Sequence, residues 1–184
     1  MGEDAGRGFG PHKKAYPAEK WCKQDNDALY ISVKALSIAW GNDKRYWRLT
    51  DVPEGIENDQ SAELLQVNWL DVSCKLDCSK INYFNQPEPK TYEIFWVIKF
   101  NVDSFGWHKA PVKFTVVSEG KKWQKAKKLE QFRKDDRLVE IPGGEFTVAP
   151  GKNTSVSFGL SETKTNWWKG NIVIAGAKIK PKNE

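Results

Sequence analysis

The chain has 184 residues, a net charge of +5 and 39% hydrophobic residues. This length is enough for one domain that buries its own core without metals or disulfides. No apolar run approaches the roughly 20 residues of a membrane-spanning helix. Residues 1–6 also lack the apolar stretch of a secretory signal and the pattern of a myristoylation site. We therefore expect a soluble, cytoplasmic protein.

The chain begins with a segment that shows no hydrophobic periodicity. Residues 1–28 are rich in Gly, Lys, Asp and Glu, which predicts a flexible N-terminal leader outside the fold. Residues 29–184 then form the single folded domain. The segment 30–40 has period two and predicts a strand with Ile38 and Trp40 on one face.

Further β-type runs follow, separated by Gly, Pro and Asn. They cover residues 63–76, 91–100, 112–117, 138–141, 145–148, 154–160 and 170–180. About eight short strands of this kind predict an all-β fold, an antiparallel β-sandwich (jelly-roll-like). Helical signal is confined to residues 61–65 and 121–133, so helices contribute only minor turns.

Nine tryptophans are more than a core of this size needs. Their flat faces suggest a ligand, and sugars are the first class to consider. Trp40 and Trp47 bracket a polar, turn-forming loop that includes Asn42 and Tyr46. The apolar face of a sugar ring stacks on an indole while polar side chains receive its hydroxyls. The alternative for Trp40 is an ordinary core position, because it lies in register with Ile38.

The other tryptophans divide by their neighbours. Trp69 and Trp96 lie within apolar runs and are predicted to be in the core. Trp167 and Trp168 are adjacent, so at most one of them can be in the core if this segment is extended.

Histidine and cysteine chemistry is sparse. His12 and His108 are the two histidines of the chain, too few for a catalytic triad or a histidine metal site. The three cysteines indicate a reducing compartment. Cys74 and Cys78 are four residues apart, unlike a Cys-x-x-Cys site, and are predicted to be buried structural thiols. We expect no metal and no cofactor.

Two charged features allow alternatives to sugar binding. Glu140, Glu145 and Glu162 could supply the paired carboxylates of a glycosidase, although sequence spacing does not bring any two together. Basic residues gather in 121–137. This stretch is typical of a solvated loop, and its alternative is an RNA-binding surface with strong salt dependence.

Four segments, in chain order, resemble the phloem protein 2 and Nictaba-related lectins of plants. They are residues 35–47, 67–72, 143–146 and 168–182. The first contains two tryptophans with six residues between them, and the last ends in Lys180-Pro181-Lys182. The resemblance implies a β-sandwich lectin without enzymatic activity. Its ligands would be N-acetylglucosamine oligomers, such as chitin fragments, and the cores of N-linked glycans.

The resemblance also implies which residues bind sugar. The two tryptophans of the family motif correspond to Trp40 and Trp47, and a glutamate six residues before Trp168 corresponds to Glu162. The predicted carbohydrate-binding residues are Trp40, Asn42, Tyr46, Trp47, Glu162 and Trp168.

Partners and location follow from the same resemblance. It implies a homodimer in the phloem sap or sieve elements, with a role in plant defence and with N-glycosylated proteins as ligands. Association with RNA or with filament proteins is known in the family, and Cys22 in the leader is the thiol expected to be most accessible. Nuclear entry would depend on residues 121–137, which are looser than a run of consecutive lysines. Residues 137–140, Arg-Leu-Val-Glu, depart from the Gly-Trp pair that relatives often carry there.

Overall fold

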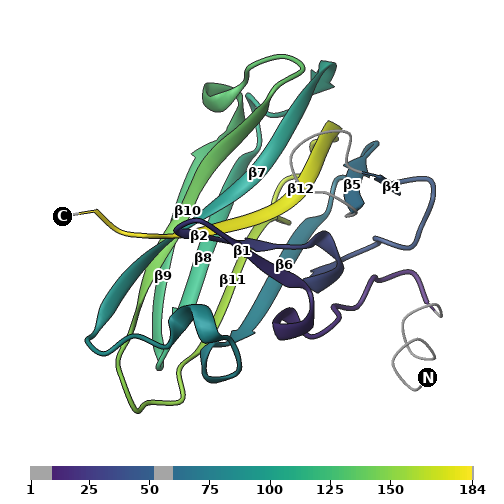
Figure 1. Ribbon diagram of the computed structural model, residues 1–184. Helices are drawn as coiled ribbons and strands as arrows, with labels where there is room; N and C mark the ends of the chain where they lie inside the picture. The colour runs from purple at the N-terminus through teal and green to yellow at the C-terminus, as the bar shows by residue number, and fades with distance from the viewer. Residues whose placement is uncertain (1–9, 52–59, 184) are drawn as a thin grey trace.

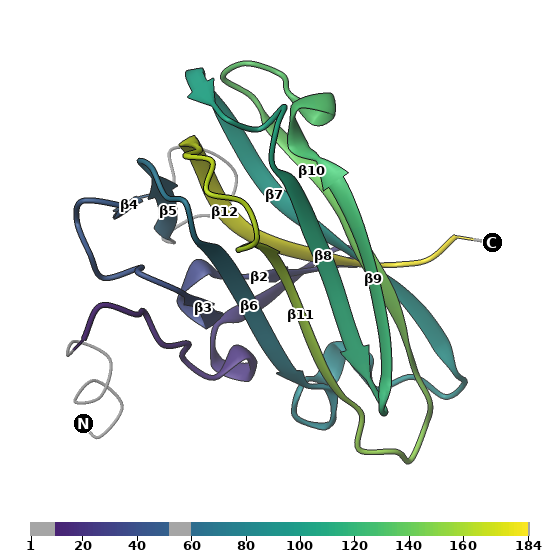
Figure 2. The ribbon, with the colours of Figure 1, turned by 180° about the vertical axis from the view of Figure 1, so that it is seen from behind.

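The computed structural model describes residues 10–51 and 60–183. Two antiparallel sheets pack face to face as a β-sandwich, which confirms the predicted fold class (Figure 1). One sheet has five strands in the order β3-β6-β11-β8-β9, and Figure 2 shows β6, β11 and β8 side by side in it. The other has seven strands, in which β12 pairs with β2, β5 and β7.

The strands are β1 (Cys22–Asp25), β2 (Ala28–Ile31), β3 (Leu36–Ile38), β4 (Trp47–Asp51), β5 (Gln60–Leu64), β6 (Leu70–Asp77), β7 (Lys90–Phe105), β8 (Pro111–Ser118), β9 (Lys121–Lys128), β10 (Leu138–Val148), β11 (Ser155–Glu162) and β12 (Gly170–Pro181). Short 3₁₀ turns lie at η1 (Ala18–Lys20), η2 (Val33–Ala35), η3 (Cys78–Lys80), η4 (Asn82–Phe84) and η5 (Leu129–Phe132). No helix in the described ranges is long and apolar enough to cross a membrane.

Alternating burial along the strands explains the sandwich. In β6 every second residue from Leu70 is buried and the residues between them face outward, and β11 repeats this pattern. The inward rows of the two sheets meet in the core, where the rings of Trp96 and Phe158 lie 5.5 Å apart. Each fully buried side chain of this size contributes roughly 2–3 kcal/mol through removal of apolar surface from water.

Two predicted strands are interrupted by turns or loops, which contain Trp40 in one case and Trp69 in the other. The segment 30–40 divides into β2, the turn η2 and β3, and it ends at a turn that contains Trp40. The segment 63–76 divides into β5 and β6, with residues 65–69 as a loop between them. Hydrophobic periodicity continued through both breaks, so it did not reveal them.

The runs 138–141 and 145–148 are predicted as two separate strands, and this is wrong, because β10 continues through the residues between them. The strand keeps its pairing with β7 and shifts register between Pro142 and Glu145, which is a β-bulge. Gly144 has φ +115°, and a Cβ there would lie 2.5 Å from Val116. Gly144 therefore forms part of a β-bulge within one strand, although the sequence around it is typical of a β-hairpin turn.

The two predicted helical segments are also strands for most of their length. Residues 61–65 fall largely in β5, and residues 121–128 form β9 at the edge of the five-stranded sheet. Only η5 is helical. Pairing with β8 places Trp123 opposite Val116, and this tertiary contact overrides a lysine-rich sequence of low strand propensity. Residues 121–128, expected as part of a solvated loop, are therefore an edge strand.

The N-terminal residues differ from the expected leader of residues 1–28. Residues 1–9 lie outside the described part of the chain. From Gly10 onward the chain packs on the sandwich, and β1 pairs with β2 in the seven-stranded sheet. Lys13 is only 8% exposed. Backbone pairing and side-chain burial hold this segment against the sandwich, even though its sequence has no hydrophobic periodicity.

Burial predicts low reactivity of the thiols. Cys74 and Cys78 are buried, and burial raises the pKa of each to about 12. Cys22 is half-buried, and burial followed by the nearby Glu19 carboxylate raises the pKa of its thiol. Because the thiolate is the reactive form, we expect an aromatic disulfide reagent at neutral pH to label Cys74 and Cys78 only after denaturation. Rapid labelling of either in the native protein would contradict their placement.

Candidate functional site

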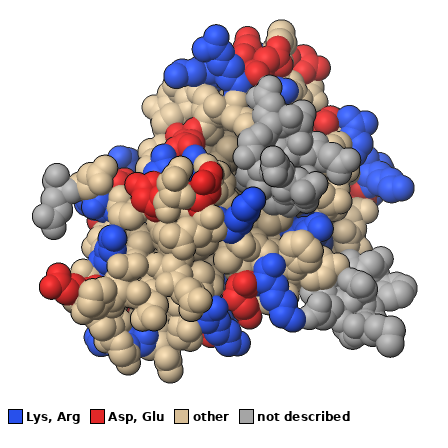
Figure 3. All heavy atoms as spheres, in the orientation of Figure 1, with Lys and Arg blue, Asp and Glu red and all other residues tan. Residues whose placement is uncertain are grey.

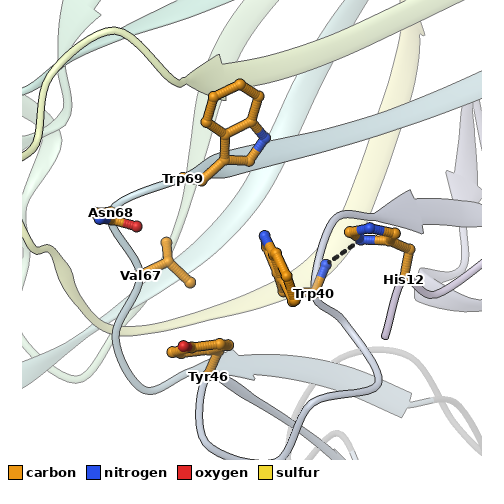
Figure 4. Close-up of a pocket in the computed structure, with 6 residues that line it drawn as sticks. All are labelled: His12, Trp40, Tyr46, Val67, Asn68 and Trp69. Carbon is orange, nitrogen blue, oxygen red and sulfur yellow. Dashed lines mark hydrogen bonds between the residues drawn. The ribbon is translucent and has the colours of Figure 1, made fainter. Parts of the chain in front are cut away.

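A pocket of about 480 Å³ opens where the turn after β3 meets the loop before β6. Its lining consists of His12, Trp40, Tyr46, Val67, Asn68 and Trp69 (Figure 4). The volume lies within the range of about 300–1,000 Å³ typical of small-molecule sites. Two indoles, one phenol ring, one imidazole and one amide dominate the lining, and the described lining residues include no Asp, Glu, Lys or Arg.

Trp40 occupies the pocket because of an unusual backbone conformation. Its φ is +63°, the left-handed region, which costs a side chain with a Cβ roughly 1–2 kcal/mol. The turn removes Trp40 from the alternation of β3, so the alternative of an ordinary core position is not what the structure shows. Its indole meets the Tyr46 ring edge to face at 6.0 Å. Strain of this kind persists where the surroundings hold it in place.

Tyr46 connects the pocket to a further exposed tryptophan. The rings of Tyr46 and Trp168 lie 6.4 Å apart, and Trp168 is 47% exposed. The Arg45 guanidinium lies 5.0 Å from the Tyr46 ring and forms an ion pair with Asp43 at 2.7 Å. The aromatic surface therefore extends from Trp40 over Tyr46 to Trp168, and the Arg45 charge beside Tyr46 is paired with Asp43.

A buried lysine, Lys169, is hydrogen-bonded to the loop that carries Asn68 and Trp69. Lys169 is fully buried, and its Nζ donates to the Asn68 carbonyl at 3.0 Å and to the Trp167 carbonyl at 3.2 Å. Its backbone pairs with Val67 in both directions. Since one side chain connects both loop segments, Lys169 sets the separation of the two exposed tryptophan-bearing loops.

Glu162 neutralises Lys169 instead of opening toward the pocket. Its Oε1 lies 3.0 Å from the Lys169 Nζ, and its other oxygen accepts the backbone N–H groups of Lys164 and Thr165 at 3.1 and 3.2 Å. The Thr165 hydroxyl donates to Oε1 of Glu162. Burial would raise the pKa of Glu162, but the hydrogen bonds from Thr165 and Lys169 outweigh it and lower the pKa. Burial lowers the pKa of Lys169.

The structure brings together some of the predicted sugar-binding residues and separates others. Trp40 and Tyr46 line the pocket, and Trp168 lies beside Tyr46. Trp47 is only 1% exposed, since it begins β4 with its side chain in the core. The Asn42 amide donates to the Gly10 and His12 carbonyls. Asn42, Trp47 and Glu162 therefore support the site from outside its lining.

Four lining residues were not predicted as site residues from the sequence: His12, Val67, Asn68 and Trp69. Trp69 was expected in the core, and this prediction is wrong because it is 48% exposed beside the pocket, whereas Trp96 is in the core as predicted. The polar Asn68 before it was the available signal for a loop. His12 lies in a segment without periodicity, so no signal pointed to it. Trp167 and Trp168 are both exposed, which agrees with the expectation that at most one is buried.

The remaining carboxylate candidates are paired on other strands. Glu140 in β10 bonds to Lys178 and Lys180 of β12 at 2.5 and 2.7 Å, and Glu145 bonds to Lys182 at 2.9 Å. Within residues 10–51 and 60–183, no group of three or more His, Cys, Asp or Glu side chains could hold a metal ion.

Comparison with known families decides the relationship of the chain. The family model described as Phloem protein 2 matches residues 26–181. The chain belongs to the phloem protein 2 family. The family match thus covers nearly the whole sandwich and begins after the N-terminal segment that carries His12.

Individual phloem protein 2 relatives come from Arabidopsis thaliana. The protein named phloem protein 2-like A9 is 32% identical over 183 residues, which cover 89% of this chain and 94% of that protein. Phloem protein 2-like A5 is 29% identical, and the match covers 85% of this chain but 38% of that protein. A putative F-box protein, PP2-B12, is 24% identical, and the match covers 83% of this chain and 60% of that protein. This chain therefore spans nearly all of one relative and only part of the others.

Solved structures give a more distant likeness. A xylan-binding domain from Paenibacillus barcinonensis has a TM-score of 0.43 at 14% identity, covering 83% of this chain and 89% of that domain. A likeness this distant carries no conclusion about the ligand.

Proposed function

We propose that this phloem protein 2 family member is a lectin that binds N-acetylglucosamine oligomers and N-glycan cores in the pocket and catalyses no reaction. The observation that carries the proposal is the pocket itself, walled by Trp40, Tyr46 and Trp69 with Asn68 at its edge. The family resemblance supports the choice of N-acetylglucosamine among sugars.

The chemistry of the lining suits a neutral sugar. A pyranose ring presents an apolar C–H face that packs on an indole, and its rim of hydroxyls needs hydrogen-bonding groups. The Asn68 amide can donate and accept such bonds, and Val67 offers an apolar contact for an acetamido methyl group. The absence of charged side chains from the described lining favours a neutral sugar over a phosphate or a sialic acid, whose charge would be desolvated without a partner.

Calorimetric titration with tri-N-acetylchitotriose tests the proposal. We expect binding in the micromolar to millimolar range, about 4–8 kcal/mol. Trp69→Ala should weaken binding by about 30-fold, equivalent to about 2 kcal/mol, because it removes one aromatic wall.

A matched control is Trp123→Ala. Trp123 is also a part-exposed indole, at 38%, but it lies in β9 at the opposite edge of the five-stranded sheet. Its removal should leave chitotriose affinity unchanged. Absence of heat with the wild-type protein, or equal losses in the two variants, would refute the proposed site.

The two alternative functions have less support. Residues 121–128 of the basic stretch form the edge strand β9, and the Lys127 ammonium donates to the Pro142 carbonyl at 2.9 Å. Edge strands commonly carry lysines because these discourage pairing with other chains, so the basic residues have an explanation without RNA. On the face in Figure 3, positive and negative side chains are interspersed. A glycosidase would need two free carboxylates, whereas Glu140, Glu145 and Glu162 are all ion-paired.

Dimer formation and location remain predictions from the family resemblance. A homodimer would present two pockets, and avidity would raise the affinity for glycoproteins that carry several glycans. We place the protein in the cytoplasm of phloem cells on the same basis.

A further inference from the structure

We propose that residues 10–16, here called the strap, are a positioning element of the sugar pocket, in which His12 acts through Trp40. The inference deepens the proposed function and rests on it. The strap precedes residues 26–181, the part of the chain that matches the family model.

The strap is fixed to the sandwich on both sides of Trp40. Lys13 exchanges two backbone hydrogen bonds with Ile38, each 2.9 Å long. Beyond the turn, the Asn42 N–H donates to the Pro11 carbonyl at 3.0 Å, and the Asn42 side-chain amide donates to two more strap carbonyls. The turn that holds Trp40 is therefore clamped to the strap at its beginning and at its end.

A buried lysine anchors the strap. Lys13 Nζ donates to the carbonyls of Val33 and Leu36 at 3.0 and 2.7 Å, where these groups face inward beside η2. Gly41 permits the close approach, because a Cβ at this position would lie 2.7 Å from the Lys13 Cβ. A strap held by buried contacts of this kind is part of the fold and can transmit a fixed geometry to its neighbours.

His12 holds Trp40 through two contacts. Its Nδ1 accepts the Trp40 backbone N–H at 2.9 Å, and its ring meets the indole at 5.0 Å in an edge-to-face arrangement. In Figure 4, Trp40 stands between His12 and Val67, with the dashed bond on the His12 side. The left-handed backbone of Trp40 needs such support. His12 thus fixes the peptide that turns the indole into the pocket.

This arrangement links the strap to the sugar pocket. The strap is bonded to both ends of the turn that carries Trp40, so it holds the Trp40 wall in place relative to Trp69. His12 is the strap residue that contacts both the Trp40 peptide and its indole.

Three variants test the inference. His12→Phe keeps a ring but removes the acceptor, and we expect chitotriose affinity to fall about tenfold, the effect of one hydrogen bond of about 1.4 kcal/mol. His12→Asn should recover most of the affinity, because its Oδ1 is attached to Cγ as Nδ1 is in histidine and can accept the same N–H. His108→Phe, the same change at an exposed loop position, should bind as the wild type does.

A second readout separates positioning from general stability. Amide hydrogen exchange of Trp40 should be slow in the wild type and in His12→Asn but fast in His12→Phe, while urea midpoints stay equal. Wild-type affinity in His12→Phe, or no recovery in His12→Asn, would overturn the role of His12.

The exchange measurement also keeps the two proposals distinguishable. If the wild-type protein binds no chitotriose, the proposed function fails, and the strap is judged by Trp40 exchange alone. Slow exchange of the Trp40 amide in His12→Phe would then overturn the positioning role, whereas fast exchange would support it.

Discussion

Trp47→Ala should lower the free energy of unfolding by about 3–5 kcal/mol, the cost of removing a large aromatic side chain from a packed core. Trp47 is 1% exposed and joins the main hydrophobic cluster. Small domains have only about 5–15 kcal/mol of stability, so this variant should be marginal or unfolded at 37 °C. Urea denaturation followed by circular dichroism measures the change.

Trp40→Ala should weaken sugar binding strongly and lower the free energy of unfolding only slightly. We expect chitotriose affinity to fall by about 30-fold, while the free energy of unfolding changes by only about 1 kcal/mol, because Trp40 is only partly buried. The two tryptophans that frame one sequence motif would then have different roles. Trp40 would line the sugar pocket, and Trp47 would stabilise the fold beneath it.

Trp47→Phe is the control that keeps this contrast testable. The Trp47 indole N–H is buried and has no hydrogen-bond partner in the described structure, so phenylalanine loses no bond and should cost only about 1–2 kcal/mol. The folded variant should bind chitotriose with wild-type affinity. A large affinity loss in Trp47→Phe with none in Trp40→Ala would reverse the assignment.

Glu162→Gln should destabilise the protein by about 3–5 kcal/mol, because it leaves the Lys169 ammonium buried without its counter-ion. Lys169 is fully buried and Glu162 is 4% exposed, so solvent does not screen the pair. Glu140→Gln is the matched control, since its partners Lys178 and Lys180 are nearer the surface. Glu140→Gln should therefore lower the free energy of unfolding by only about 0–1 kcal/mol, the usual contribution of an exposed ion pair.

The pH dependence of this effect has a definite sign. The pKa of Glu162 is lowered in the folded state from its ordinary value of 4.5, so the unfolded chain takes up this proton first as pH falls. The stability that the carboxylate contributes is complete above about pH 4.5 and is lost as pH decreases through the folded pKa. The difference in unfolding free energy between wild type and Glu162→Gln should therefore shrink below that pH. A difference that stays constant down to pH 3 would contradict the pairing.

Sugar binding should respond to the same substitution, although Glu162 lies outside the pocket lining. Lys169 connects the Asn68 and Trp167 carbonyls, so loss of its partner loosens the loop that carries Asn68 and Trp69. Through this path Glu162 would affect sugar binding, the role that the family resemblance implies for it, without touching the sugar. Chitotriose titration of the folded Glu162→Gln variant measures the effect.

Local pattern was enough to predict the sandwich. Alternation in segments such as 112–117, 154–160 and 170–180 depends only on which residues prefer water, and the structure confirms these strands as β8, β11 and β12. The same pattern could not locate the ends of strands, because apolar residues continue through the turn at Trp40 and the loop before Trp69. Trp40 was assigned to the site because polar turn residues follow it. Trp69 was missed because Val67 and Leu70 beside it continue an apolar run despite the intervening Asn68.

The amino-acid sequence by itself determined the all-β class, the family resemblance and the aromatic character of the site. Only the tertiary structure decided which aromatic rings face the pocket. An indole in a strand and an indole in a left-handed turn look alike in sequence, and their exposure depends on contacts between distant segments. His12 shows this most clearly, since its place in the site depends on hydrogen bonds to residues about 30 positions away. Such pairings arise from packing and leave no periodic signal in the chain.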